Sequence, residues 1–126
     1  MVRVKICGIT NEADALAAID AGANLLGFNF YEKSPRFITE AEAARIRPQL
    51  PKKVEAVGIF VNASTAEITA LRKSVKLNVA QLHGDETPEA VAEIAHILPG
   101  DQSLPSRARL FLEDPRRILR RICFSV

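Results

Sequence analysis

The chain has 126 residues, of which 48% are apolar and 25% charged, and its formal net charge is +2. This length suits one domain that buries roughly two-thirds of its unfolded surface, and the composition is that of an ordinary soluble protein. No apolar run approaches the roughly 18 residues of a membrane span, and no secretory apolar region follows Met1. The sequence has two cysteines, Cys7 and Cys123, which are too few for a disulfide framework. We therefore expect a cytoplasmic protein.

The excess positive charge is confined to the C-terminal part of the chain. Residues 1–98 hold 11 Lys and Arg against 12 Asp and Glu, a net charge of −1. Residues 99–126 hold 6 Arg, no Lys and 3 acidic residues, a net charge of +3. Basicity that is limited to one end does not indicate that the body of the protein binds nucleic acid. The change to Arg alone indicates that two parts with different histories meet near residue 98.

Four short apolar runs predict four strands, over residues 2–7, 24–30, 54–61 and 77–82. An amphipathic stretch with a helix start signal follows each run. These signals are Thr10-Asn11, the capping boxes Thr39/Glu42 and Ser64/Glu67, and Thr87-Pro88. Strands that alternate with helices in this way predict βα units, a parallel sheet and right-handed crossovers.

Two architectures fit this pattern, an open doubly wound sheet and a closed (β/α)₈ barrel. The first strand-to-helix turn reads CGITN and lacks the G-x-G-x-x-G signature of dinucleotide binding, so the open sheet loses support. Lys5 and Cys7 share one face of the first strand, and Gln81 and His83 share one face of the fourth. Polar side chains that face inward at strand ends favour the mouth of a barrel.

The βα pattern ends after Leu98. Residues 99–109 are polar and predict no strand, and Asp114-Pro115 begins at most one short Arg-rich helix. Eight βα units need roughly 200 residues or more. We therefore predict a truncated barrel of about four βα units in residues 1–98. Residues 99–126 then form an irregular, short-helical tail, as a truncated or frameshifted reading frame would produce.

Cys7 is the first candidate for chemistry, because it ends a strand and Gly8 lets the backbone turn there. Lys5 lies about 7 Å away on the same face, and an ammonium group at that range favours the thiolate. A buried, inert cysteine is the alternative interpretation. Arg36 follows the second strand in a loop that Pro35 stiffens, and its guanidinium suits a carboxylate or a phosphate. A solvated surface arginine fits that position equally well.

Other polar residues follow the third and fourth strands. His83 fits either a substrate contact or a hydrogen bond to a buried carbonyl, and Asn62 fits a turn cap better than a substrate contact. Asp85 and Glu86 suit the first turn of the next helix. His96 is expected on a helix surface. No residues have the spacing of metal ligands, and we expect no metal site.

Four segments together resemble the phosphoribosylanthranilate isomerases of tryptophan biosynthesis. They are KICGIT at 5–10, GFNFYEKSPRFI at 27–38, VGIFVN at 57–62 and QLHGDET at 81–87. Their order and spacing make the resemblance specific over residues 1–98, which correspond to about half of that family's barrel.

The resemblance implies a (β/α)₈ barrel that needs no cofactor and converts N-(5-phosphoribosyl)anthranilate to 1-(2-carboxyphenylamino)-1-deoxyribulose 5-phosphate. An aspartate in the second half of the barrel protonates the ribose ring oxygen in that family, and a cysteine removes the proton from C2′ of the sugar. The resemblance assigns the base to Cys7 and the anthranilate carboxylate to Arg36. Further candidates for substrate binding are Lys5, Asn62, Gln81 and His83.

Residues 99–126 offer no counterpart to the catalytic aspartate or to the family's glycine-containing phosphate loops. One hypothesis is an active isomerase. The second, which we favour, is a non-catalytic fragment whose fourth strand has an edge that must be covered by the tail, by another half-barrel or by aggregation. The third is a barrel completed by a second chain or by a homo-oligomer. We expect a phosphorylated small molecule as substrate, and neither nucleic acid nor membrane as partner.

Overall fold

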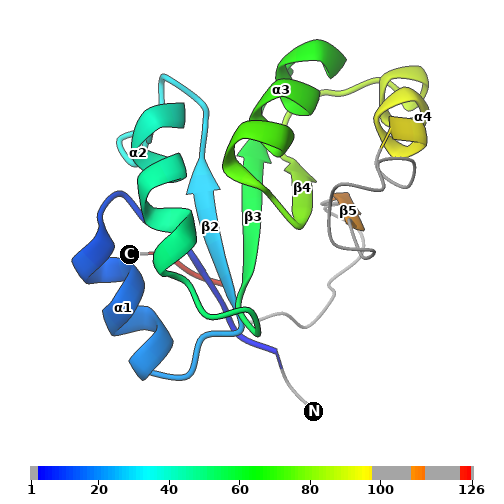
Figure 1. The fold of residues 1–126 in the computed structure, drawn as a ribbon. Helices are drawn as coiled ribbons and strands as arrows, with labels where there is room; N and C mark the ends of the chain where they lie inside the picture. The colour runs from blue at the N-terminus through cyan, green and yellow to red at the C-terminus, as the bar shows by residue number, and fades with distance from the viewer. Residues whose placement is uncertain (1–2, 98–108, 113–122, 126) are drawn as a thin grey trace.

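The computed structural model describes residues 3–97, 109–112 and 123–125, and within them all strand pairs are parallel (Figure 1). The strands of the sheet follow the order β5-β4-β3-β2-β1-β6. In chain order the elements are β1 (Lys5–Cys7), α1 (Glu12–Asp20), β2 (Leu25–Asn29), α2 (Glu40–Ile46), the 3₁₀ helix η1 (Arg47–Gln49), β3 (Glu55–Phe60), α3 (Thr65–Val75), β4 (Val79–Leu82), α4 (Pro88–Ile97), β5 (Arg109–Leu112) and β6 (Cys123–Ser125).

The helices cover one face of the sheet. Figure 1 shows α1, α2 and α3 in front of the strands, and the main apolar core lies between these two layers. Leu26, Ala56 and Ala80 belong to that core, whereas their neighbours Leu25, Val57 and Val79 form a separate buried cluster. Because side chains alternate along a strand, the second cluster marks the opposite face, which we call the inner face. Among the described residues, no helix has the length and apolar character that crossing a bilayer requires.

The predicted helix starts are confirmed. Asn11 caps α1 through a hydrogen bond of 2.8 Å from the Asp14 N–H to the Asn11 side chain. Both predicted capping boxes form, at Thr39/Glu42 and at Ser64/Glu67. The backbone N–H and hydroxyl of Thr39 donate to the Glu42 carboxylate and lower its pKa. These caps satisfy N–H groups that the first turn of a helix leaves without partners.

The segment that the sequence assigned to an irregular tail contains two short strands. Strand β5 pairs with β4, and β6 pairs with β1. Their sequences, RLFL and CFS, are too short to show a period of two, so the prediction of a segment without strands was wrong at residues 109–112 and 123–125. The short helix predicted to start at Asp114-Pro115 lies outside the described residues. The edge of β4 is therefore covered by β5, which belongs to the C-terminal segment. Cover by the tail was one of the three alternatives given for this edge.

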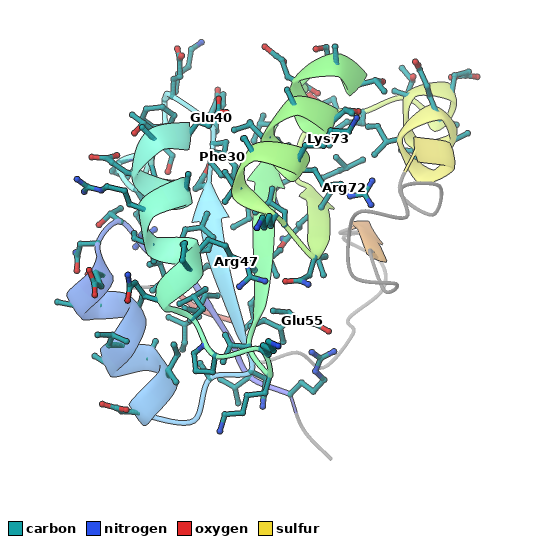
Figure 2. All side chains as sticks on the ribbon, viewed as in Figure 1. Phe30, Glu40, Arg47, Glu55, Arg72 and Lys73 are labelled. Atoms are coloured by element: carbon teal, nitrogen blue, oxygen red, sulfur yellow. The ribbon has the colours of Figure 1, made fainter. Side chains whose placement is uncertain are left out.

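Asparagine side chains join successive strands at their amino ends. Asn24 accepts the Val4 N–H at 2.9 Å through Oδ1, and Asn78 accepts the Ala56 N–H at the same distance. The Asn78 oxygen also accepts a hydrogen bond of 3.1 Å from Arg47 (Figure 2), whose pKa is lowered by burial. Each asparagine therefore satisfies a backbone donor that the parallel ladder leaves open.

We expect Asn78→Ala to lower the stability of the chain by roughly 1–3 kcal/mol, since it leaves the N–H of the buried residue Ala56 without an acceptor. Urea unfolding followed by circular dichroism measures this loss. Asn78→Asp is the matched control, because it keeps Oδ1 and its partners, so most of the stability should remain. Equal urea midpoints for Asn78→Ala and the unaltered chain would show that this oxygen has no such role.

Candidate functional site

The carboxyl ends of β1 to β4 lie at one edge of the sheet, because neighbouring strands are parallel. The loops that leave these ends carry the polar residues singled out from the sequence. Cys7 ends β1, Asn62 follows β3, and His83 follows β4. Arg36 lies in the loop between β2 and α2. The topology therefore gathers the candidate residues at one edge, the end at which parallel α/β sheets place their ligands.

A contact across the inner face shows that the sheet is tilted and curved as in a barrel. The Lys5 ammonium on β1 donates to Oε1 of Gln81 on β4, although β2 and β3 lie between these strands. In a flat sheet, three strand spacings separate β1 from β4 by about 14 Å. The strand registers place Gln81 level with Asn29 of β2. Lys5 is level with Leu25, which lies four residues before Asn29 on the same strand. Barrel strands have this stagger, so residues offset in register meet across the interior.

The Cys7 thiol lies over a glycine of the neighbouring strand. Cys7 pairs in register with Gly27 of β2, and a Cβ added at Gly27 would lie 3.2 Å from Cys7 Sγ. Glycine thus leaves room for the sulfur, which is half-buried at the edge of the sheet. The chain turns immediately after the cysteine, at Gly8, with a φ of +84° that favours glycine.

The Arg36 side chain crosses from the loop after β2 to the end of β1. A Cβ added at Gly8 would overlap Arg36 Cδ and would lie 3.2 Å from Arg36 Nε. The guanidinium group is therefore held against the residue that follows Cys7. Arg36 is also exposed, so the solvent reaches this side chain.

Asn29 and Ser34 hold this arginine loop in place. Asn29 Nδ2 donates to Ser34 Oγ at 3.2 Å, and the Arg36 N–H donates to the same hydroxyl at 3.1 Å. Asn29 Oδ1 accepts the Tyr31 N–H at 2.9 Å. Sequence analysis did not single out Asn29 or Ser34, and the signal that was available is an Asn at a strand end that starts a turn.

Asn62 and Glu86 tie the loop after β3 to the loop after β4. The Asn62 side chain accepts the Asp85 N–H at 2.9 Å, in a left-handed backbone with a φ of +52°. The Glu86 carboxylate accepts the N–H groups of Asn62 and Gly84, at 3.0 and 2.9 Å. The turn role expected of Asn62 is thus present. Glu86 precedes α4 and binds these loop N–H groups, a link that sequence analysis missed.

His83 is exposed at the end of β4, beside this pair of loops. The backbone N–H of His83 donates to the backbone carbonyl of Phe60 at 2.9 Å, and this bond extends the pairing of β3 and β4 by one residue. The structure therefore brings Cys7 and Arg36 together through Gly8, and it joins Lys5 to Gln81. Within the described ranges, no three His, Cys, Asp or Glu side chains gather as metal ligands would.

Two functional groups with different chemistry, a guanidinium and a thiol, lie at the carboxyl end of the sheet. A guanidinium fork beside Gly8 can hold a planar carboxylate through two hydrogen bonds. A thiol that becomes a thiolate can remove a proton from a molecule held there, since free cysteine titrates near pH 8.5.

Comparison with known proteins identifies the family of this chain. The family model for N-(5′-phosphoribosyl)anthranilate isomerase matches residues 4–106. The isomerase of Trichlorobacter lovleyi is 51% identical over 94 residues, covering 75% of this chain and 46% of its own length. That of Geobacter sulfurreducens is 51% identical over 89 residues, with coverages of 71% and 44%. The chain thus spans a little under half the length of these curated relatives.

Solved structures of isomerases are also similar to this chain. An isomerase in complex with reduced 1-(o-carboxyphenylamino)-1-deoxyribulose 5-phosphate superposes with a TM-score of 0.74 at 49% identity, over 76% of this chain and 50% of its own. The Thermus thermophilus isomerase also gives 0.74, at 38% identity, over 92% of this chain and 55% of its own. The chain therefore belongs to the N-(5′-phosphoribosyl)anthranilate isomerase family and forms about half of that family's barrel.

Proposed function

We propose that this chain supplies one half of an active site for the rearrangement of N-(5-phosphoribosyl)anthranilate in tryptophan biosynthesis. Arg36 binds the anthranilate carboxylate, and Cys7 is the general base. The observation that carries the proposal is the Arg36 side chain against Gly8, next to Cys7. A related isomerase has been solved with a ligand that carries a carboxyl group and a phosphate, which supports a substrate of this kind.

The proton transfers fit these two residues. Ring opening, which requires an acid, leaves an iminium group between the anthranilate nitrogen and C1′. The Cys7 thiolate then removes the C2′ proton, and the C–H electron pair forms the C1′=C2′ bond of an enolamine. A proton returned to C1′, together with loss of the 2′-hydroxyl proton, gives the ketone. Because a proton next to an iminium is acidic, a moderate base is enough for this step.

Lys5 and Gln81 suit a supporting role in this proposal. Their hydrogen bond crosses the inner face below the mouth, and Gln81 is 4% exposed. Lys5 and Cys7 lie two residues apart on β1 and therefore share its inner face. His83 and Asn62, both exposed at the mouth, remain candidates for contacts with the sugar.

The isolated chain is proposed to be inactive, and the paired edges of the sheet support this. Strand β5 occupies the free edge of β4, and β6 occupies the free edge of β1. The rest of a barrel would have to join at these two edges. The acid that the resemblance places in the second half of the family's barrel is also outside the motifs found in this sequence. Cytoplasmic location follows from the proposed pathway.

We expect no isomerase turnover from the purified chain and no growth of an isomerase-deficient tryptophan auxotroph that expresses it. Co-expression with the second half of a related barrel should restore growth, because it supplies the acid and the phosphate loops. A chain that ends at residue 98 should be rescued better than the full chain, since β5 and β6 no longer compete for the edges. Growth on the 126-residue chain alone would refute the inactive-fragment proposal.

In that restored barrel, Cys7→Ala should lower kcat by about 10²–10⁴-fold with little change in the affinity for a product analogue. A base acts in the transition state, so its loss spares ground-state binding. Steady-state kinetics and calorimetric titration separate the two quantities. Near-normal turnover of the Cys7→Ala enzyme would remove the base assignment.

Arg36→Lys should mainly raise KM in the same enzyme, because an ammonium group cannot form the paired hydrogen bonds of the guanidinium fork. We expect roughly a tenfold rise, the order that a lost charged hydrogen bond gives. Arg45→Lys, at an exposed position on α2, is the matched control and should leave KM unchanged. If both variants behave alike, Arg36 does not bind the carboxylate.

A further inference from the structure

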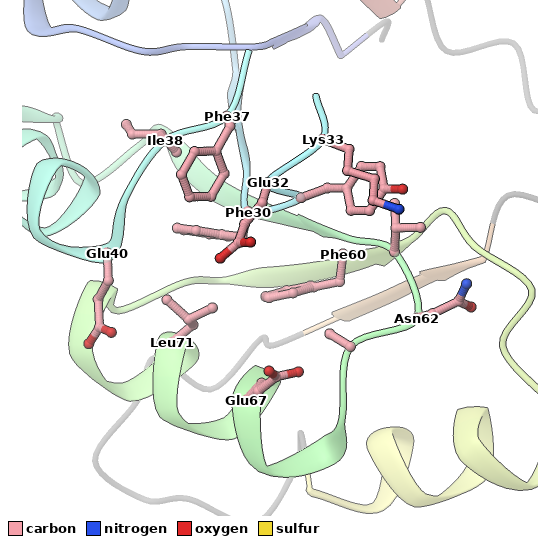
Figure 3. Close-up of a pocket in the computed structure, with 13 residues that line it drawn as sticks. Phe30, Glu32, Lys33, Phe37, Ile38, Glu40, Phe60, Asn62, Glu67 and Leu71 are labelled. Atoms are coloured by element: carbon pink, nitrogen blue, oxygen red, sulfur yellow. The ribbon is translucent and has the colours of Figure 1, made fainter. Parts of the chain in front are cut away.

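A cleft of about 490 Å³ opens between α2, α3 and the loops after β2 and β3. Figure 3 shows this cleft with its lining side chains. The volume lies within the range of small-molecule sites, roughly 300–1,000 Å³. Cys7, Arg36, Lys5 and Gln81 do not line it. Asn62, a candidate for contacts with the sugar, does line the cleft, so the cleft adjoins the site proposed for the isomerase reaction without including Cys7 or Arg36.

Aromatic side chains are concentrated in this cleft. Phe30, Tyr31, Phe37 and Phe60 line it, and they are four of the seven aromatic residues in the sequence, which has six Phe and one Tyr. The rings of Phe30 and Phe60 are stacked, with centroids 5.6 Å apart and planes inclined by 22°. Leu71 of α3 adds a further apolar wall (Figure 3). Because Phe60 is 2% exposed, the half-buried side chains of Phe30, Phe37 and Leu71 supply the apolar surface that a ligand ring can reach.

Carboxylates surround the aromatic floor. Glu32, Glu40 and Glu67 line the cleft, against one lysine, Lys33. Figure 3 shows the three carboxylates arranged around Phe30 and Phe60. Glu67 also caps α3 by accepting the Ser64 N–H at 2.9 Å, and all four charged residues are exposed. Negative charge around aromatic faces repels an anion and attracts an organic cation.

We propose that this cleft binds small organic cations that join an aromatic ring to an ammonium group. The ring packs on Phe30, Phe37 and Leu71, and the ammonium group lies among the three glutamates. Charge complementarity selects the cation, since a carboxylate in the same position would face three like charges. The apolar floor selects the ring over a simple inorganic ion.

The single tyrosine of the chain makes a direct test possible. The sequence has no Trp and one Tyr, so tyrosine fluorescence reports on Tyr31, which lines the cleft. Titration of the full chain with phenethylamine at low salt should change this emission in a saturable way. With 3-phenylpropionate, which has the same ring and the opposite charge, the change should be at least tenfold weaker. Equal responses to the two compounds, or none at millimolar concentration, would overturn the proposal.

Variants locate the charge contribution. Glu40→Gln combined with Glu67→Gln should weaken phenethylamine binding roughly tenfold, and Gln at position 67 still completes the capping box. Glu12→Gln combined with Glu89→Gln removes two exposed carboxylates on α1 and α4 and should leave binding unchanged. Circular dichroism checks that both pairs fold. Equal affinities of the two double variants would overturn the assignment of the ammonium group to this cleft.

Discussion

The tilt and curvature of the parallel sheet set the position of each side chain on its inner face. The hydrogen bond from Lys5 to Gln81 joins strands that are three positions apart in the sheet, at levels that differ by four residues. Such a contact needs the stagger that closes a barrel. Four βα units are therefore enough to produce barrel-like geometry, because the twist belongs to each strand pair and not to the closed ring.

The two edges of this curved sheet decide what the chain can do. An unpaired parallel edge is a row of free N–H and C=O groups that attracts other strands. Strands β5 and β6 satisfy the two edges with seven residues in all, four on β4 and three on β1. These two ladders span the whole of β4 and the whole of β1, so a second half-barrel would have to displace β5 and β6 to pair there. Protection from aggregation and access for a second half-barrel thus depend on the same two strand pairs.

Much of the first 98 residues was predictable, because local signals and fold agree there. The caps at Asn11, Thr39 and Ser64 are formed by side chains within one helical turn, so the sequence contains both partners. The alternation of Lys5 with Cys7 likewise identified the inner face. These features depend on neighbours in the chain, which is why patterns of spacing reveal them.

Features that depend on distant partners were not predictable. The link from Glu86 to the Asn62 N–H spans two loops, and Glu86 alone is a typical helix-start acid. The strands RLFL and CFS are defined by the edges that they pair with, since nothing in their own composition separates them from a loop. The motif resemblance identified Cys7 and Arg36, but nothing in the motif predicts that the Arg36 side chain reaches Gly8.

The loop that carries Arg36 also forms a wall of the aromatic cleft, which connects the two sites physically. Arg36 extends toward Gly8, whereas Tyr31 and Phe37 of the same loop line the cleft. The bonds at Asn29 and Ser34 hold one loop conformation for both purposes. A cation that stabilised this conformation would raise the affinity of Arg36 for a carboxylate. Linkage then requires the carboxylate to raise the affinity for the cation by the same factor, because the coupling free energy is shared by both ligands.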